Sequence, residues 1–296
     1  YTELLPNEAN PQDTFAEISR MAGRYEEALK HYHLSLKIDP TFHESQLGLG
    51  DTYALMGDEA KAREEYAVAI QEGTKIQAIL WALQSAATYV REGNLSGADE
   101  AFEEVAKQAH AEDFGNIEAE AFRSMALYQK DVSKALQLLD KAETILHEKH
   151  KVPQGLLDEE MAAVLRTRVE RAIQNENMAL AAASLKFLQG MAEANSDGIV
   201  QSHYSGAAGA VLVAQGKYED AIVQLEEDSD NPFSMRLLFQ AYQKTGNQQA
   251  MERVAQKLSK FNEPLIEQAV VVLPFRKIRA ASPTAGPQHR EWAMEW

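Results

Sequence analysis

The eight histidines of this 296-residue chain are the first candidates for chemistry, because imidazole binds metal ions and transfers protons. His147 and His150 are three residues apart, a spacing that can place two side chains on one face of a helix. Neither a third histidine nor a carboxylate is evident at ligand spacing, so a metal site is not expected. We predict instead that both are solvated cations near a helix C-terminus. His31 and His33 point to different sides of one helix, which predicts surface positions.

Other reactive patterns also lack the neighbours that their chemistry requires. The segment Gly48–Asp51 resembles a phosphate loop but has neither a third glycine nor a preceding strand. Acidic pairs such as Glu103 and Glu104 are adjacent on a helix, whereas a glycosidase holds its two carboxylates across a cleft. There is no Gly-x-Ser-x-Gly motif, and the absence of cysteine excludes disulfides, thiolate catalysis and cysteine-bound metals. We therefore predict no catalytic residue, no metal and no cofactor.

The net charge of the chain restricts the classes of partner that it is expected to bind. Its 45 acidic residues outnumber its 29 lysines and arginines, giving a formal net charge of −16. Nucleic-acid binding draws on clustered cations, so a nucleic-acid partner is not expected. The acidic surface can serve solubility or attract a basic partner. No apolar run approaches the roughly 20 residues of a membrane span, which predicts no direct membrane insertion. The lack of cysteine and the start at Tyr1 favour an extracytoplasmic bacterial location, with the cytoplasm as the alternative.

A repeated pattern of glycine, alanine and an aromatic residue positions the side chains in space. Gly23, Gly57 and Gly93 are 34 and 36 residues apart. Each is followed by an alanine and then an aromatic residue, as Ala28 and Tyr32, Ala62 and Tyr66, and Ala98 and Phe102. This code resembles that of the tetratricopeptide repeat (TPR) family, whose period is 34 residues. The resemblance implies stacked helical hairpins, with Gly50 allowing two helices to approach closely and Gly57 adopting positive φ.

The code weakens after Gly93 and returns at Gly216 and Gly246, which predicts lengthened middle repeats. We expect an all-α fold, a TPR-type α-solenoid of six to seven helical hairpins in a right-handed superhelix. A C-terminal capping helix and an irregular tail would follow the hairpins. The expected divisions are an N-terminal extension at 1–12, repeats one to four at 13–149, divergent repeats five to seven at 150–263, a capping helix at 264–279 and a tail at 280–296.

In a TPR superhelix the first helix of each repeat lines the concave face. By this resemblance the predicted partner-binding residues are Leu47, Asp51, Leu55, Leu80, Leu83, Val90, Leu127 and Tyr128, with Arg166, Arg236 and Lys244 at the far end. Asp13 and Glu17 would make the near end acidic, unlike the TPR subset that clamps a C-terminal carboxylate with Lys and Asn. An apolar trough with charged ends suits an amphipathic helix or an extended peptide. The alternative is that some of these side chains pack within the chain itself.

The C-terminal end offers a second candidate contact. Arg276, Lys277 and Arg279 form a basic cluster, and Trp292 and Trp296 follow it. Because tryptophan is enriched at interaction hot spots, this tail is predicted to dock on a partner or on its own solenoid.

Together these patterns predict a non-catalytic scaffold or an accessory subunit of a larger assembly, which binds a protein or peptide in its groove. One alternative is a peptide-sensing regulator that uses His147–Gly155 as a hinge. An enzyme built on helical hairpins is the alternative from another class, and convergent carboxylates of shifted pKa in a deep pocket would favour it.

Overall fold

Helices make up all the regular secondary structure in the described part of the chain. The structure is a computed structural model and describes residue 5 and residues 7–281. Within these residues there are fifteen α-helices, one π-helical stretch and no strand. The predicted all-α fold is confirmed.

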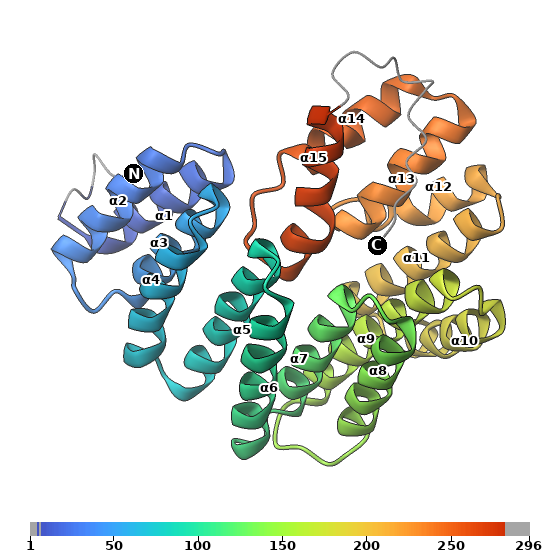
Figure 1. The fold of residues 1–296 in the computed structure, drawn as a ribbon, viewed down its shortest axis with the longest axis horizontal. Helices are drawn as coiled ribbons and strands as arrows, with labels where there is room; N and C mark the ends of the chain where they lie inside the picture. The colour runs from blue at the N-terminus through green and yellow to red at the C-terminus, as the bar shows by residue number, and fades with distance from the viewer. Residues whose placement is uncertain (1–4, 6, 282–296) are drawn as a thin grey trace. The chain divides into compact units, whose positions relative to one another are not determined.

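Fourteen of the helices follow one another as seven pairs (Figure 1). The first helices of the pairs are α1 (Ala9–Met21), α3 (His43–Met56), α5 (Lys75–Glu92), α7 (Gly115–Tyr128), α9 (Gln154–Gln174), α11 (Gly198–Ala214) and α13 (Pro232–Thr245). The second helices are α2 (Tyr25–Ile38), α4 (Glu59–Glu72), α6 (Leu95–Ala111), α8 (Val132–Leu146), α10 (Met178–Ala194), α12 (Tyr218–Glu226) and α14 (Gln248–Ser259). The chain thus has the upper number of the six to seven pairs predicted.

The turn inside six of the seven pairs is marked by left-handed backbone. Positive φ angles of 73° to 84° occur at the glycines of five turns, Gly23, Gly57, Gly93, Gly216 and Gly246. Glycine suits this position after a helix because it has no Cβ to clash with the backbone. The fifth pair uses Glu176 with φ of 55°, and the fourth turn passes through extended Gln129. The loss of the glycine code in the middle of the chain therefore reflects different turns between the same kind of helices.

Within a pair, a bulky side chain of the second helix lies against a residue of the first helix that lacks one. A Cβ added to Gly50 would lie 2.5 Å from the ring of Tyr66. The same addition at Gly209 would lie 2.4 Å from Leu225 in the sixth pair. Tyr66 and Leu225 are fully buried. These contacts confirm the close helix approach predicted at Gly50.

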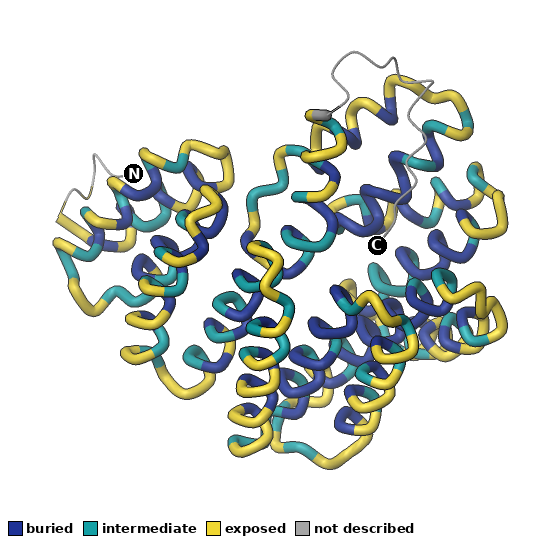
Figure 2. Tube along the Cα trace, viewed as in Figure 1, coloured by how far each residue is buried: buried dark blue, intermediate teal, exposed yellow. Residues whose placement is uncertain are grey.

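First helices are more deeply buried than their partners, as Figure 2 shows for α9 and α13. The reason is visible in the contacts of α11, which packs against α9, α10, α12 and α13. A helix covered on several sides must be apolar over most of its surface, and α11 is rich in alanine, valine and glycine. Each pair therefore completes the core of its neighbours, as repeat proteins require.

The chain divides into two compact units. Unit 1 contains the described part of residues 1–105 together with Lys260–Leu273, and unit 2 contains Ala106–Ser259 and residues 274–281. The boundary falls inside α6, whereas the sequence suggested a division after residue 149. The unusual feature is that a segment late in the sequence belongs to the N-terminal unit.

The two ends of the helical array differ in detail from the expected divisions. Helix α1 begins at Ala9, within the expected extension 1–12, because Pro11 is compatible with the first turn of a helix. After α14 the chain becomes helical again at Ile266, passes through the π-helical stretch η1 (Gln268–Val272) and continues as α15 (Leu273–Ala281). Most of the predicted tail 280–296 lies outside the described residues.

The glycine contacts predict a large difference between two helical glycines. Gly50→Ala is expected to lower the free energy of unfolding by about 1–3 kcal/mol, because its methyl group would collide with Tyr66. Gly190→Ala in α10 is the matched control, since no atom lies within 4 Å of its added Cβ. It is expected to raise the free energy of unfolding by about 0.5–1 kcal/mol. Urea denaturation of both variants measures this, and equal effects would contradict the packing described.

Candidate functional site

The side chain of His150 is buried in unit 2, where it fixes the segment that connects α8 to α9. Its Nε2 donates to the carbonyl oxygen of Ile145 at 2.7 Å, and its Nδ1 lies 3.1 Å from a carboxylate oxygen of Asp113. A Cβ on Gly115 would lie 2.4 Å from the imidazole ring, so the ring packs against the start of α7. The prediction of a solvated cation is wrong for His150, whereas His147 is exposed. The contacts pin the segment between α8 and α9, which the sequence suggested as a hinge.

Hydrogen bonding to two oxygens decides the charge of His150. Burial lowers the pKa of the imidazole, but the Ile145 carbonyl and the Asp113 carboxylate stabilise the protonated ring and raise its pKa above the ordinary value. Hydrogen bonding to His150 correspondingly lowers the pKa of Asp113. The site is therefore an ion pair within the chain.

The other histidines considered as reactive groups either make contacts within the chain or are exposed. His33 is exposed as predicted, but His31 is half-buried, stacked on Phe15 and 2.8 Å from the side-chain oxygen of Gln12. Among the described residues, no group of three or more histidine, aspartate or glutamate side chains is placed to hold a metal ion. None of the helices in this part of the chain combines the length and apolar character that a bilayer crossing requires.

A groove of about 410 Å³ lies in unit 2 between α10, α11 and α12. Apolar side chains such as Leu185, Val211 and Val223 line it, and Asp220 is the single carboxylate among its lining residues. Convergent carboxylates, which would favour an enzyme, are thus not found in this groove.

The repeat period identifies a face of unit 1 that changes from polar to apolar. Shifts of 34 and 36 residues align four positions of α1 with four of α3 and four of α5. They are Asn10, Asp13, Glu17 and Arg20 in α1, then Glu44, Leu47, Asp51 and Ala54 in α3, then Leu80, Leu83, Ala87 and Val90 in α5. We call these twelve residues the α1–α3–α5 face. All four of its α5 residues are apolar, whereas α1 contributes only polar and charged ones.

Three carboxylates form the acidic end of this face, Asp13, Glu17 and Glu44. Burial raises the pKa of Asp13, and the charges of Glu17 and Glu44 raise it further. The Ser45 hydroxyl donates to Asp13 at 2.7 Å and Arg20 lies nearby, and both act in the opposite direction. Burial is the largest cause of the net increase and the charges of Glu17 and Glu44 add to it, so a cation placed beside these carboxylates would be stabilised.

Asp51, a member of this face and a predicted partner contact, is buried. It accepts a hydrogen bond from the Tyr66 hydroxyl at 2.8 Å and lies 3.3 Å from Nη1 of Arg20. Burial raises the pKa of Asp51, while Arg20 and Tyr66 favour its charged form. The three side chains come from α1, α3 and α4, so the network joins the first two pairs. Leu55 is also buried.

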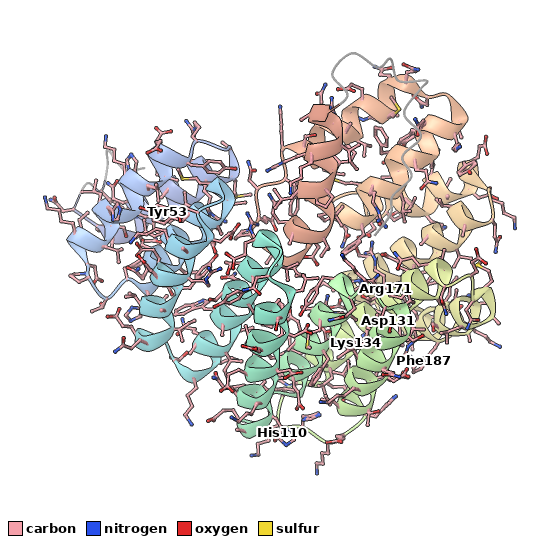
Figure 3. All side chains as sticks on the ribbon, in the orientation of Figure 1. Tyr53, His110, Asp131, Lys134, Arg171 and Phe187 are labelled. Carbon is pink, nitrogen blue, oxygen red and sulfur yellow. The ribbon has the colours of Figure 1, made fainter. Side chains whose placement is uncertain are left out.

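Arginines near the ends of first helices were not anticipated from the sequence. Arg91 of α5 forms an ion pair with Glu59 at 2.9 Å and donates to the carbonyl oxygen of Ala54 at the end of α3. Arg171, labelled in Figure 3, donates in the same way from α9 to the carbonyl oxygens of Ala126 and Leu127 at the end of α7. Each satisfies carbonyls that a helix end leaves without partners. The available signal was an arginine shortly before an intra-pair turn, two residues before Gly93 and five residues before Glu176.

The apolar end of the face consists of the four α5 residues. Leu80 is 40% exposed, whereas Leu83 is 9% exposed and Ala87 is buried. Leu47 of α3 and Val90 are half-buried. The predicted groove residues of unit 1 thus include three that are buried, Asp51, Leu55 and Leu83, and three that still reach the surface, Leu47, Leu80 and Val90.

In unit 2 the predicted contact residues are mostly internal. Leu127 and Tyr128 are buried at the end of α7. Arg166 is buried in an ion pair with Asp228 at 2.7 Å and donates to Ser234 at 2.9 Å. Burial lowers the pKa of Arg236 to about 10, with Arg166 and Arg171 contributing. Lys244 alone among the three predicted basic contacts is exposed.

Two of the three residues in the basic cluster near the C-terminus make contacts within unit 2. Arg276 donates through Nε to the carbonyl oxygen of Ser259 at 2.9 Å, and Arg279 forms an ion pair with Glu252. Lys277 is exposed. Trp292 and Trp296, the predicted docking residues of the tail, lie outside the described residues.

The His150 site predicts a specific pH dependence. Because the folded pKa is raised, the stabilisation by His150 is complete below the ordinary pKa of 6.5 and is lost as pH rises through the folded value. The difference in unfolding free energy between the wild type and His150→Gln should therefore shrink from pH 5.5 to pH 8.5. We expect a change below about 1 kcal/mol, because Asp113 is partly exposed and solvent screens the pair. Urea titrations measure it, and a difference that stays constant or grows as the pH rises would contradict the ion pair described.

Comparison with known proteins gives one family match. Residues 20–87 match the family model described as tetratricopeptide repeat. No curated protein matches the sequence. A chain of the APC/C hetero-tetramer Cut9–Hcn1 is 16% identical with a TM-score of 0.47, covering 86% of this chain and 44% of that one. The TPR domain of P58(IPK) is 14% identical with a TM-score of 0.29, covering 95% of this chain and 94% of that domain.

This chain spans less than half the length of the Cut9–Hcn1 chain that it matches. The family match covers α2, α3 and α4 whole, together with most of α5. It therefore includes the turn glycine Gly57 and the packed residues Gly50 and Tyr66. This match shows that residues 20–87 are of the tetratricopeptide repeat type, and glycine turns and helix pairs of the same kind continue beyond them.

Proposed function

We propose that the protein is a non-catalytic interaction scaffold whose α1–α3–α5 face binds a protein segment that is both basic and apolar. The observation that carries the proposal is the exposure of Leu80, a large apolar side chain on the same face as three carboxylates. Repeat proteins use such extended faces for binding. A segment with leucine-like residues at one end and lysine or arginine at the other matches both ends of the face.

The charge of unit 1 supports a basic partner. Residues 1–105 and 260–273 contain 21 aspartates and glutamates but only 9 lysines and arginines. The remaining residues contain 24 acidic and 20 basic side chains, so most of the net negative charge belongs to unit 1. A field of this kind raises the association rate of a cationic partner and weakens with added salt.

The acidic end contributes to the affinity for a basic partner as well as to its rate of association. Repulsion from Glu17 and Glu44 helps to raise the pKa of Asp13. A lysine or arginine of the partner would offset this repulsion, and the bound state would hold the Asp13 carboxylate in its charged form. Binding should therefore weaken when the pH falls far enough to protonate Asp13.

Leu80→Asp tests the apolar end of the face. We expect the substitution to weaken partner binding at least tenfold, because it places a charge where apolar contact is needed. Val68→Asp on α4 is the matched control, since Val68 is 42% exposed against 40% for Leu80 and lies in the same unit. Partners captured from the source cells and cross-linked to the wild type should be lost with Leu80→Asp and kept with Val68→Asp.

The salt dependence of binding and the positions of the cross-links distinguish binding to the α1–α3–α5 face from nonspecific capture. Cross-links of the partner are expected at α1, α3 and α5, and its binding should weaken as sodium chloride is raised. Equal retention of partners by both variants, in proteins with unchanged helical circular dichroism, would remove the α1–α3–α5 face from consideration.

A further inference from the structure

A short segment late in the sequence forms part of unit 1. The chain reaches Lys260–Leu273 from α14 and continues from it into α15, and both of these helices lie mainly in unit 2. We call Lys260–Leu273 the strap. It combines an irregular stretch up to Pro264 with the helical residues that include η1.

The first anchor of the strap is the side-chain amide of Asn262 at the turn between α1 and α2. The Tyr25 hydroxyl donates to Oδ1 of Asn262 at 2.9 Å, and Nδ2 of Asn262 donates to the carbonyl oxygen of Met21 at 3.1 Å. Gly23, in the same turn, allows this approach, since an added Cβ would lie 3.3 Å from Nδ2. One amide is thus bound through both of its polar atoms.

The second anchor is apolar and involves α5. The π-helical stretch η1 packs against α5, and its residues Val271 and Val272 are 2% and 0% exposed. Leu83 and Ala87, which belong to the apolar end of the α1–α3–α5 face, are also buried. Leu80, one turn earlier in α5, remains exposed. The strap therefore packs on α5, the helix that carries the apolar end, while Leu80 on the same helix is open.

We propose that the strap is an internal occupant of the apolar end, which a partner must displace to bind the whole face. This inference rests on the proposed function and adds regulation to it. In the closed form a partner reaches Leu80, the half-buried Val90 and the acidic end. In the open form Leu83 and Ala87 also become available, and the contact area grows.

Because the strap is acidic, a basic segment of a partner can displace it from unit 1. The strap carries Glu263 and Glu267 against one lysine, Lys260, and so adds negative charge to a unit that already has an acidic excess. The same field attracts a partner that carries lysine or arginine. A cationic apolar segment thus gains an electrostatic advantage over the strap at equal apolar contact.

The absence of cysteine from the sequence allows a direct test in the whole 296-residue chain. Single variants Val271→Cys and Leu265→Cys place one thiol on the strap at a buried and at a 39% exposed position. The reaction rate with 5,5′-dithiobis(2-nitrobenzoate) measures opening. We expect Val271→Cys to react roughly 100-fold more slowly than Leu265→Cys, because it reacts only while the strap is open.

Asn262→Ala tests the first anchor. Removing its two hydrogen bonds is expected to speed the reaction of Val271→Cys about tenfold. Leu139→Cys, fully buried in unit 2, is the control for general unfolding and should react at an unchanged rate. Equal acceleration of both thiols would contradict a local opening of the strap.

A synthetic peptide of residues 260–273 tests whether the covered surface can exchange its occupant. Added in excess to the Asn262→Ala protein, it should speed the reaction of Val271→Cys further by holding the strap open. Sodium chloride should slow the reaction, because it screens repulsion between the strap and unit 1.

Three results would overturn the proposal: reaction of Val271→Cys as fast as Leu265→Cys, an equal effect of Asn262→Ala on Leu139→Cys, or no effect of the peptide. Failure of the proposed function has a different signature. In that case Leu80→Asp leaves partner capture unchanged, while the thiol rates still report an opening strap.

Discussion

The stacking of a tyrosine ring on a glycine is the contact on which the arrangement of unit 1 depends. Tyr66 of α4 lies where a Cβ of Gly50 would be, and Tyr32 of α2 lies in the same way against Gly48 of α3. The two rings therefore fix α3 against both its own partner helix and the preceding pair. Tyr66 also donates to Asp51, which is paired with Arg20. Packing and polar contacts thus set one spacing between α1, α3 and α4, and that spacing defines the α1–α3–α5 face.

The sequence was sufficient for the fold because the repeated residues act locally. A glycine after a helix, an alanine five residues later and an aromatic residue four residues after that specify a turn and one helix–helix contact. The glycine pattern does not predict a turn in which another residue adopts positive φ, as Glu176 does in the fifth pair. Periodicity also placed Leu80 correctly as an apolar residue that reaches the surface. It could not distinguish Leu80 from Leu55, because both are leucines in first helices.

The residues that the sequence did not assign owe their roles to contacts between distant segments. His150 is buried because Gly115 leaves room for its ring and Asp113 supplies a charge, and neither is apparent from the His147 and His150 spacing. Arg166 was a predicted surface contact, but Asp228 is 62 residues away in sequence and pairs with it in the interior. The strap is the extreme case, since 237 residues separate Tyr25 from Asn262. Helical periods describe neighbours along the chain and carry no information on such pairs.

The position of the strap in the sequence has a consequence during biosynthesis. The last residue of unit 1 before the strap is Val105, and the strap begins only at Lys260. At about 5–20 residues per second, translation of the intervening chain takes on the order of ten to thirty seconds. During this interval α1 to α5 have emerged and can pair, while the apolar residues of α5 have no strap to cover them. For this interval a nascent chain therefore leaves uncovered the part of α5 that η1 packs against in the finished protein.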